Sequence, residues 1–408
     1  MQTTVAVLFL LAYLGIALGR VPGLALDRTG IALLGAIAMI GVGAITTSEA
    51  LQAIDVSTIL LLYALMVVSA QFRLGGFYTW AALRITRYMD QPKWFLLLLM
   101  AVSALFSSVL ANDIVCLAFT PVVTVALLGR GFDPVPYLIG LAVSSNIGSA
   151  ATIIGNPQNM LIGQLAHLDF GGFPSWCLPP SLAALAAAYL ILIGCCRTGL
   201  AVRNPPRNVA ADGWPQLNRH QSGKGLIAAS ILLLLFFTPV PREMSAIAVA
   251  GCLLCSRKMK TRAILGLVDW HLITLFCSLF IIIGALQTTG IPARLMTRLT
   301  VLAIDPTDPY ILTLISTLLS NFTSNVPAVM LLTKFLDPAN TQAWYLLALS
   351  STFAGNLVVI GSIANLIVIE EARHYGVNIS FGSHARVGLP VTVATLAIVF
   401  LWIYLARL

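Results

Sequence analysis

The chain has 408 residues, of which 59% are hydrophobic and only 9% charged, and apolar runs long enough to cross a membrane recur from end to end. This composition excludes a soluble globular domain and predicts a multi-pass membrane protein. The basic residues that give the net charge of +8 lie in the loops between apolar runs. This distribution is typical of membrane proteins, in which basic loops set the orientation, and it argues against a nucleic-acid partner. The seven cysteines fall mostly inside apolar runs, so we expect no disulfide framework.

The first half of the chain is predicted to cross the membrane five times. We place the crossings near residues 4–19, 29–47, 56–73, 134–166 and 176–196. The segment at about 94–129 is not one of these five crossings, and it has two apolar arms around the polar elbow Ala111-Asn112-Asp113. Arms of about 15 residues reach only part way through a hydrocarbon core of about 30 Å. We therefore interpret this segment as a re-entrant hairpin.

The crossing at 134–166 contains the polar stretch SSNIGSAATIIGNPQNMLIG. Non-helical backbone at membrane depth is tolerated only where it is buried in protein or lines a wet cavity. The stretch therefore predicts a broken helix with an unwound link at 149–156. Asn156 is expected to cap the second half-helix, and Pro157 to occupy its first position.

A long polar loop at 199–225 divides the chain into a first repeat at 1–198 and a second at 226–408. The second repeat is predicted to contain the same elements in the same order. Its crossings are placed near 226–240, 244–256, 265–287, 343–369 and 386–407, the fourth being a broken helix, and its hairpin is placed at about 309–335.

Two gap-free alignments support the repeat. The stretch that begins at Ile54 aligns with the one that begins at Val268, so that Asp55 meets Asp269 and Gly76 meets Gly290. The stretch that begins at Ser144 aligns with the one that begins at Ser350. This second alignment places Gly155 on Gly361, Asn156 on Ser362 and Asn159 on Asn365.

The basic residues predict the orientation of the repeats. Eighteen of the 23 Lys and Arg residues fall on the side of the 199–225 loop and five on the other side. Because basic residues favour the cytoplasmic side, we expect this loop to be cytoplasmic and both termini to lie outside. An odd number of crossings per repeat makes the repeats inverted. The predicted fold class is thus an all-α polytopic membrane protein of two inverted repeats, each with about five crossings, one of them broken, and one re-entrant hairpin.

Broken helices and hairpin tips at related positions of inverted repeats predict a transport site near the membrane midplane. Each break exposes a helix N-terminus, which suits an anionic or oxygen-rich ligand. The alternative is that these small residues only permit tight helix packing. The candidate substrate-binding residues are Asn112, Ser149, Thr152, Gly155, Asn156, Asn159, Asn321, Asn325, Asn356, Gly361, Ser362 and Asn365. We expect no catalytic residues, no metal site and no cofactor.

Asp113 is the one carboxylate predicted to lie deep in the membrane. Desolvation favours its neutral form, so uptake and loss of a proton there would couple transport to a pH gradient. The alternative is a hydrogen-bonded structural aspartate at the hairpin turn. Asp55 and Asp269 lie at predicted helix starts, where we expect them to act as caps.

Four stretches resemble the ion transporter superfamily, whose members include arsenite efflux pumps, sodium/proton antiporters, citrate transporters and divalent anion/sodium symporters. These stretches are GGFYTWAALRITR, LANDIVCLAFTP, NIGSAATIIGNPQN and LSNFTSNVPAV. The dicarboxylate symporters of this superfamily carry Ser-Asn-Thr at both hairpin tips. This chain has Ala111-Asn112-Asp113 and Ser324-Asn325-Val326 instead. The absence of the threonines argues against sodium-coupled dicarboxylate uptake and is compatible with proton coupling through Asp113.

The resemblance implies a secondary active transporter of the bacterial inner membrane that exports a small oxyanion or metalloid, arsenite or antimonite first, in exchange for protons. A sodium/proton antiporter, or an anion permease of the di- or tricarboxylate type, is the alternative. The implied partners are the substrate, a coupling proton or sodium ion, and membrane lipid. A homodimer and, for an arsenite pump, a soluble ATPase partner remain open.

Overall fold

The computed structural model describes residues 1–19, 23–197, 199–200, 205–207, 214–256, 258–301 and 305–406. Within these ranges the regular structure is helical throughout. Among the described residues, six helices are long and apolar enough to cross a membrane: α4 (Val56–Leu74), α6 (Pro92–Val109), α7 (Asn112–Gly129), α10 (Gly172–Cys195), α14 (Trp270–Thr288) and α20 (Phe381–Leu405). The predicted all-α membrane fold is therefore confirmed. Residues 201–204 and 208–213 of the predicted 199–225 loop lie outside the described ranges.

Both halves of the chain contain the same series of α-helices. In the first half the remaining helices are α1 (Gln2–Leu18), α2 (Arg28–Gly41), α3 (Thr47–Ala53), α5 (Phe77–Ile85), α8 (Val135–Ser149) and α9 (Pro157–Leu165). In the second half they are α11 (Arg219–Leu235), α12 (Arg242–Leu254), α13 (Thr261–Leu265), α15 (Ile291–Val301), α16 (Pro309–Thr323), α17 (Asn325–Leu332), α18 (Thr341–Ala354) and α19 (Ile363–His374). Short 3₁₀ turns at Thr86–Tyr88, Thr333–Phe335 and Val359–Gly361 complete the series.

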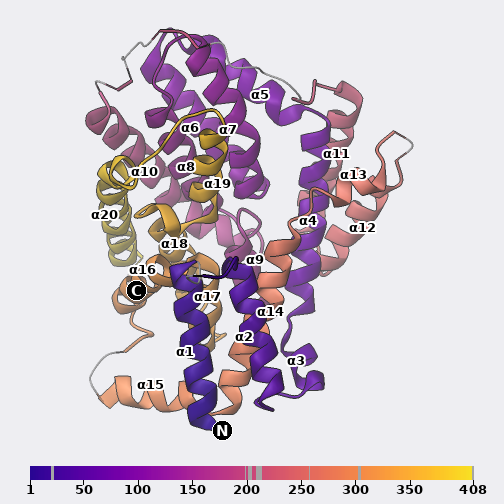
Figure 1. The fold of residues 1–408 in the computed structure, drawn as a ribbon, viewed down its shortest axis with the longest axis vertical. Coiled ribbons are helices and arrows are strands. Elements are labelled where there is room, and N and C mark those ends of the chain that lie inside the picture. The colour runs from indigo at the N-terminus through magenta and orange to yellow at the C-terminus, as the bar shows by residue number, and fades with distance from the viewer. Residues whose placement is uncertain are drawn as a thin grey trace.

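The second repeat is inverted relative to the first. Figure 1 shows α5 near the top of the molecule and its counterpart α15 at the bottom. The first hairpin, α6 and α7, lies in the upper half of the same view, and the second hairpin, α16 and α17, lies in the lower half. The two hairpins therefore enter from opposite sides, as inverted repeats require.

The helices form two bundles that each combine elements of both repeats. In the scaffold bundle, made of α1–α4 and α11–α14, α4 packs on α12 and α14 packs on α2. In the hairpin bundle, made of α6–α10 and α16–α20, α6 packs on α8, α16 on α18, and α10 on α20. The contacts of α4 with α9, and of α14 with α17, join the two bundles. The chain thus passes from the scaffold bundle to the hairpin bundle at α5 in the first repeat and at α15 in the second.

The helices α4 and α14 begin after equivalent aspartates and end before equivalent glycines. The Oδ1 atom of Asp55 accepts the backbone N–H of Thr58 at 2.7 Å, and that of Asp269 accepts Leu272 at 2.9 Å, so the predicted capping role of both aspartates is confirmed. Gly76 follows α4 with φ 71°, and Gly290 follows α14 with φ 67°. Glycine adopts this left-handed conformation without the steric cost that a Cβ imposes, so it ends both helices at aligned positions.

The predicted lengths were wrong for two segments. The arms of the first hairpin have 18 residues each rather than about 15, which is long enough to cross a membrane. The chain nevertheless turns back at Leu110 and Ala111, so this segment is a hairpin because of where it turns and not because its arms are short. The crossing predicted at 29–47 has only 14 helical residues, since α2 ends at Gly41 and a left-handed Gly43 begins the connection to α3.

Candidate functional site

Two asparagines hold the unwound links in the same way. The Nδ2 atom of Asn159 donates to the carbonyl oxygens of Thr152 at 2.9 Å and Ser149 at 3.2 Å, seven and ten residues earlier in the chain. The Nδ2 atom of Asn365 likewise donates to the carbonyls seven and ten residues earlier, at 3.2 and 2.7 Å. A buried helix break leaves carbonyl groups without helical partners, and these amides supply the missing donors.

The second half-helix of each break starts as predicted. The Oδ1 atom of Asn156 accepts the backbone N–H of Asn159 at 2.8 Å, and Pro157 is the first helical residue of α9. In the second repeat the Oγ atom of Ser362 accepts the backbone N–H of Ala364 at 3.2 Å, which starts α19. Both caps are almost fully buried, so two helix N-termini point into the protein interior.

Each cap also contacts the other repeat. The Nδ2 atom of Asn156 donates to Oγ1 of Thr352 at 3.2 Å, and the Oγ atom of Ser362 donates to Oδ1 of Asn146 at 2.9 Å. Asn146 and Thr352 occupy aligned positions in the two repeats. Asn146 additionally donates Nδ2 to Oδ1 of Asn356 at 3.0 Å. Because its side chain contacts the second link at both Ser362 and Asn356, Asn146 is the central residue that sequence reasoning missed, although its alignment with another polar residue was a signal.

The hairpin tips contact the links. The backbone N–H of Asn112 donates to the carbonyl of Gly155 at 3.2 Å, and its Nδ2 lies 3.4 Å from Oδ1 of Asn146. Asn325 carries its amide in the orientation that lets Nδ2 donate to the carbonyl of Gly361 at 3.0 Å. Gly155 and Gly361 are aligned, so each tip contacts the equivalent carbonyl of its own repeat. The two tips and two links thus converge on one buried polar cluster.

The convergence includes all twelve predicted site residues. Asn321, the most peripheral of them, donates Nδ2 to the carbonyl of Thr317 at 2.9 Å, and its Oδ1 lies beside Gly361. Within the described residues, four buried side-chain atoms of the cluster have no hydrogen-bond partner: Oδ1 of Asn112, Oδ1 of Asn159, Oδ1 of Asn321 and Nδ2 of Asn356. Unpaired buried polar groups are costly, so these atoms are available to a polar ligand. The role of these residues in binding stays a prediction.

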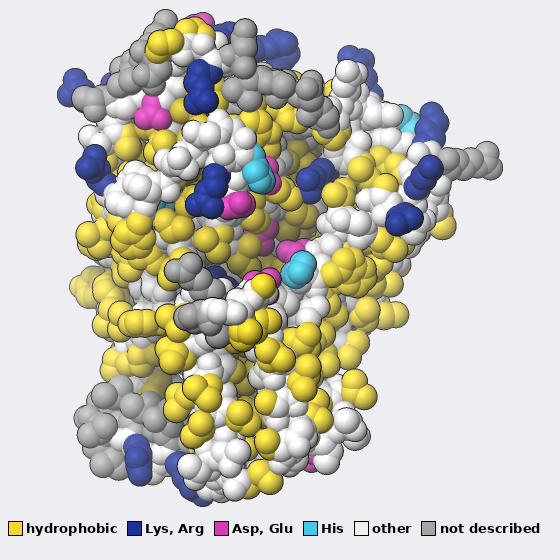
Figure 2. All heavy atoms as spheres, viewed as in Figure 1, with side chains coloured by type: hydrophobic (Ala, Val, Ile, Leu, Met, Phe, Trp, Pro, Cys, Tyr) yellow, Lys and Arg dark blue, Asp and Glu magenta, His cyan; other side chains and the backbone are white. Residues whose placement is uncertain are grey.

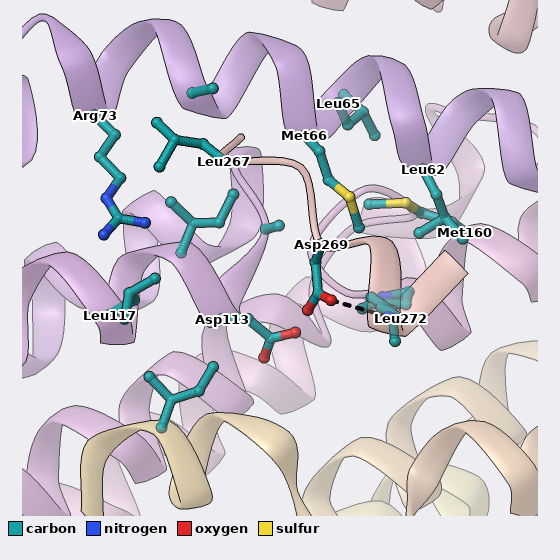
Figure 3. Close-up of a pocket in the computed structure, with 15 residues that line it drawn as sticks. Leu62, Leu65, Met66, Arg73, Asp113, Leu117, Met160, Leu267, Asp269 and Leu272 are labelled. Atoms are coloured by element: carbon teal, nitrogen blue, oxygen red, sulfur yellow. Dashed lines mark hydrogen bonds between the residues drawn. The ribbon is translucent and has the colours of Figure 1, made fainter. Parts of the chain in front are cut away.

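A cavity of about 80 Å³ reaches the first hairpin tip from one side. Its charged lining residues are Arg73, Asp113 and Asp269, and the rest of its lining is mostly aliphatic. Figure 3 shows the two carboxylates side by side in this cavity with the Arg73 guanidinium at one end. Figure 2 shows acidic side chains at the edge of a hollow in the middle of this face. Asp113 is half-buried, and the cap Asp269 is also a lining residue, which sequence reasoning did not predict.

A second cavity, of about 220 Å³, occupies the equivalent place in the other repeat. Gln287 lines it at the position that Arg73 takes in the first cavity, 214 residues earlier, and Met330 takes the place of Leu117. Arg73, near the end of α4 that leads to α5, lines the first cavity, and Gln287, near the end of α14 that leads to α15, lines the second. Figure 1 shows α5 near the top of the molecule and α15 at the bottom. The tip residues Ala111 and Asp113 line the first cavity. The second is lined farther from its tip, by Met330 of α17 and by Lys334 of the 3₁₀ turn that follows.

Curated proteins whose sequences are similar to this chain include membrane transporters. Among curated relatives, the 46 kDa membrane protein of Mycobacterium leprae is 30% identical over 438 residues and covers 99% of both chains. A silicon efflux transporter of Oryza sativa subsp. japonica is 28% identical, over 93% of this chain and 92% of its own. A putative transporter of Dictyostelium discoideum, arsB, is 23% identical over 92% of this chain and 87% of its own.

The fold is also found in a solved structure. The YdaH transporter of Alcanivorax borkumensis superposes with a TM-score of 0.55 at 15% sequence identity, over 100% of this chain and 98% of the other. At this identity the likeness concerns the fold alone. A family model described as citrate transporter, CitMHS, matches residues 9–353. The chain therefore belongs to the citrate transporter family, and it is a multi-pass membrane transporter and not an enzyme.

Proposed function

We propose that this protein is a proton-coupled secondary active transporter that exports a small oxyanion or metalloid, arsenite or antimonite first, across the bacterial inner membrane. The observation that carries the proposal is the buried cluster of amides, hydroxyls and helix N-termini, which has a single carboxylate, Asp113, at the neighbouring hairpin tip. The substrate binds to the cluster, and Asp113 takes up and releases the coupling proton.

The chemistry of the cluster favours a small uncharged hydroxylated ligand. Arsenous acid is largely neutral at pH 7, and amide side chains with helix N-termini can bind it without a fixed countercharge. A doubly charged dicarboxylate beside an ionised Asp113 would be repelled. The relatives named for silicon efflux and as arsB support an export role with a metalloid substrate.

The two cavities support alternating access. The first is lined near the end of α4 that leads to α5 and the second near the end of α14 that leads to α15, and the lining of each comes from both the scaffold bundle and the hairpin bundle. In this structure the first cavity reaches a hairpin tip and the second is lined by residues away from the tip. Movement of one bundle against the other would close the first cavity and extend the second to the same polar cluster.

A citrate-type anion permease is the second candidate. The family description and the guanidinium of Arg73 in the first cavity favour it, since arginine binds carboxylates with paired hydrogen bonds.

A sodium/proton antiporter on the same fold is a third candidate. The unpaired amide oxygens of Asn112 and Asn159 favour it, because sodium prefers oxygen ligands. A homodimer and a soluble ATPase partner stay predictions.

Growth assays distinguish these candidates. A metalloid-sensitive bacterial strain is grown with and without the chain on arsenite, on high sodium and on citrate as carbon source. We expect rescue on arsenite, and loss of rescue in Asn112→Ala and Asn325→Ala variants that still reach the membrane. Asn378→Ala, at an exposed position between α19 and α20, is the control that retains rescue. Growth on citrate without arsenite rescue would replace the metalloid exporter with the anion permease.

A further inference from the structure

Two basic side chains line one cavity that is separate from the polar cluster. The cavity has a volume of about 340 Å³, and its lining comes from the start of α6 and the end of α10. Lys93 is the second residue of α6, and Arg197 follows α10 by two residues. The other described residues that line the cavity are uncharged: Gln91, Pro92, Trp94, Ile193 and Leu200. The charge of this lining is therefore positive.

Neither basic side chain has an acidic partner within the part of the chain that the structure describes. Lys93 and Arg197 take part in none of the ion pairs found there. Asp90, three residues before Lys93, is paired with Arg130 at 3.3 Å. Asp133 accepts the first backbone N–H of α8 at 3.0 Å. Two cations that share a cavity repel each other, and a bound anion would offset this repulsion.

The outer face of α10 that leads to the cavity is apolar. Leu182 and Leu190 are 56% and 66% exposed. Ile193 lies one turn beyond Leu190 on the same face and lines the cavity, and Arg197 follows in the turn after the helix. An exposed apolar face on a membrane-spanning helix contacts acyl chains. The cavity therefore lies at the end of a lipid-facing surface.

The neighbouring helix α6 contributes an aromatic residue to the same place. α6 packs on α10, and both lie in the upper half of the molecule in Figure 1. The hydroxyl group of Tyr189 in α10 donates to the backbone carbonyl of Lys93 at 3.2 Å, which holds the start of α6 against α10. Trp94 is 57% exposed and lines the cavity. Because exposed tryptophans of membrane proteins concentrate at the depth of the lipid headgroups, we place the cavity at that depth.

We propose that this cavity binds the phosphate of an anionic phospholipid, whose acyl chains lie along the exposed face of α10. Lys93 and Arg197 are the phosphate ligands. Basic pockets at the ends of membrane helices bind anionic headgroups, and arginine binds phosphate with paired hydrogen bonds. A free phosphate ion shares the headgroup chemistry but makes no use of the leucine surface beside the cavity. The proposal does not depend on which substrate is transported.

The start of the second hairpin has no counterpart of Lys93. Its first arm, α16, also begins with a proline, but the second residue is Tyr310. The ring of Tyr310 packs on that of Phe400 in α20, with centroids 5.6 Å apart. The lipid is therefore expected at the first repeat, on the side of the 199–225 loop into which α10 leads.

The test is native mass spectrometry of the purified full-length protein in detergent with added dioleoyl phosphatidylglycerol. Dioleoyl phosphatidylcholine, which has the same acyl chains and no net charge, is the reference lipid. The double variant Lys93→Gln/Arg197→Gln should bind phosphatidylglycerol about twentyfold more weakly, since each basic residue near an anionic lipid contributes a factor of about five. The double variant Lys258→Gln/Lys260→Gln removes two exposed charges elsewhere and should bind it as the wild type does.

Equal affinities of the wild type for the two lipids would overturn the proposal, and so would equal weakening in the two double variants. The unfolding temperature in detergent separates a lipid from a free anion. We expect it to rise with phosphatidylglycerol in the wild type and not in Lys93→Gln/Arg197→Gln. An equal rise with inorganic phosphate alone would reject the lipid. Either failure would leave the proposed function untouched, because arsenite rescue is measured separately.

Discussion

Asn159 and Asn365 form the same two hydrogen bonds in the two repeats. Each donates its side-chain amide to the carbonyls seven and ten residues earlier, which belong to Thr152 and Ser149 in the first repeat and to Val358 and Gly355 in the second. All three pairs of residues are separated by 206 positions, the separation of the aligned links. One asparagine in each repeat thus replaces the donors that an unbroken helix would provide.

Removal of either asparagine amide should destabilise the protein and abolish transport. In Asn159→Ala and Asn365→Ala two buried carbonyls lose their donors, at a cost of about 1–3 kcal/mol for each group left unpaired. The unfolding temperature in detergent should fall for both variants and to a similar extent. Asn378→Ala, at an exposed position, should leave it unchanged. Full transport by either link variant would show that the amide does not maintain the break.

Gly155 should tolerate no side chain, and Gly361 should tolerate one poorly. A Cβ at Gly155 would lie 2.2 Å from the carbonyl oxygen of Ser149, whereas at Gly361 the nearest atoms are 3.2 Å away. Gly155→Ala is therefore expected to abolish membrane accumulation, and Gly361→Ala to reduce transport with accumulation intact. Gly382→Ala, in a helix with open space around it, should be neutral or stabilise by up to about 1 kcal/mol. Equal accumulation of all three variants would contradict the close approach at Gly155.

The contact between Ser362 and Asn146 should couple the repeats energetically. Their side chains lie 2.9 Å apart and both are nearly fully buried. A double-mutant cycle with Ser362→Ala and Asn146→Ala should give a coupling of about 0.5–3 kcal/mol in unfolding free energy. The pair Ser362 and Ser383, the latter on the exposed start of α20, provides the uncoupled reference. Strict additivity for Ser362 and Asn146 would mean that the contact contributes nothing to stability.

Orientation is tested by labelling single cysteines in a cysteine-free background. Lys258 and Asp305 are exposed and lie on opposite sides in the predicted topology. We expect an impermeant thiol reagent to label Asp305→Cys in intact cells and Lys258→Cys only after permeabilisation, since the positively charged side should be cytoplasmic. The opposite pattern would contradict the predicted orientation and place the first cavity on the outside.

The repeat and the breaks were predictable because their signals are local. Asn156 followed by Pro157, and Gly361 followed by Ser362, identify two helix starts whatever surrounds them. The alignment then related the two breaks to one another. Polar residues in aligned positions were enough to identify every element that meets in the cluster.

The contacts of Asn146 and the place of Asp269 in the lining of the first cavity depend on tertiary structure. Every residue of α8 from Pro136 to Ser149 is buried, so no polar face distinguishes Asn146 from its neighbours. In the sequence, capping of a helix already accounts for Asp269, so nothing there indicates a place in the cavity. It lines the same cavity as Asp113 because of how the two bundles pack. The hairpin arms were predicted too short because only two residues separate α6 from α7, and Asn112 and Asp113 of the predicted elbow already belong to α7.

The most direct measurement compares pH-driven transport with counterflow exchange in everted vesicles that contain Asp113→Asn. Asparagine has nearly the same shape as protonated aspartate but cannot release a proton, so substrate can still exchange while a pH gradient no longer drives it. We predict that pH-driven arsenite movement falls to the level of vesicles without the chain and that counterflow exchange persists. Undiminished pH-driven transport by the variant would contradict proton coupling through Asp113 and leave it as a residue that stabilises the hairpin turn.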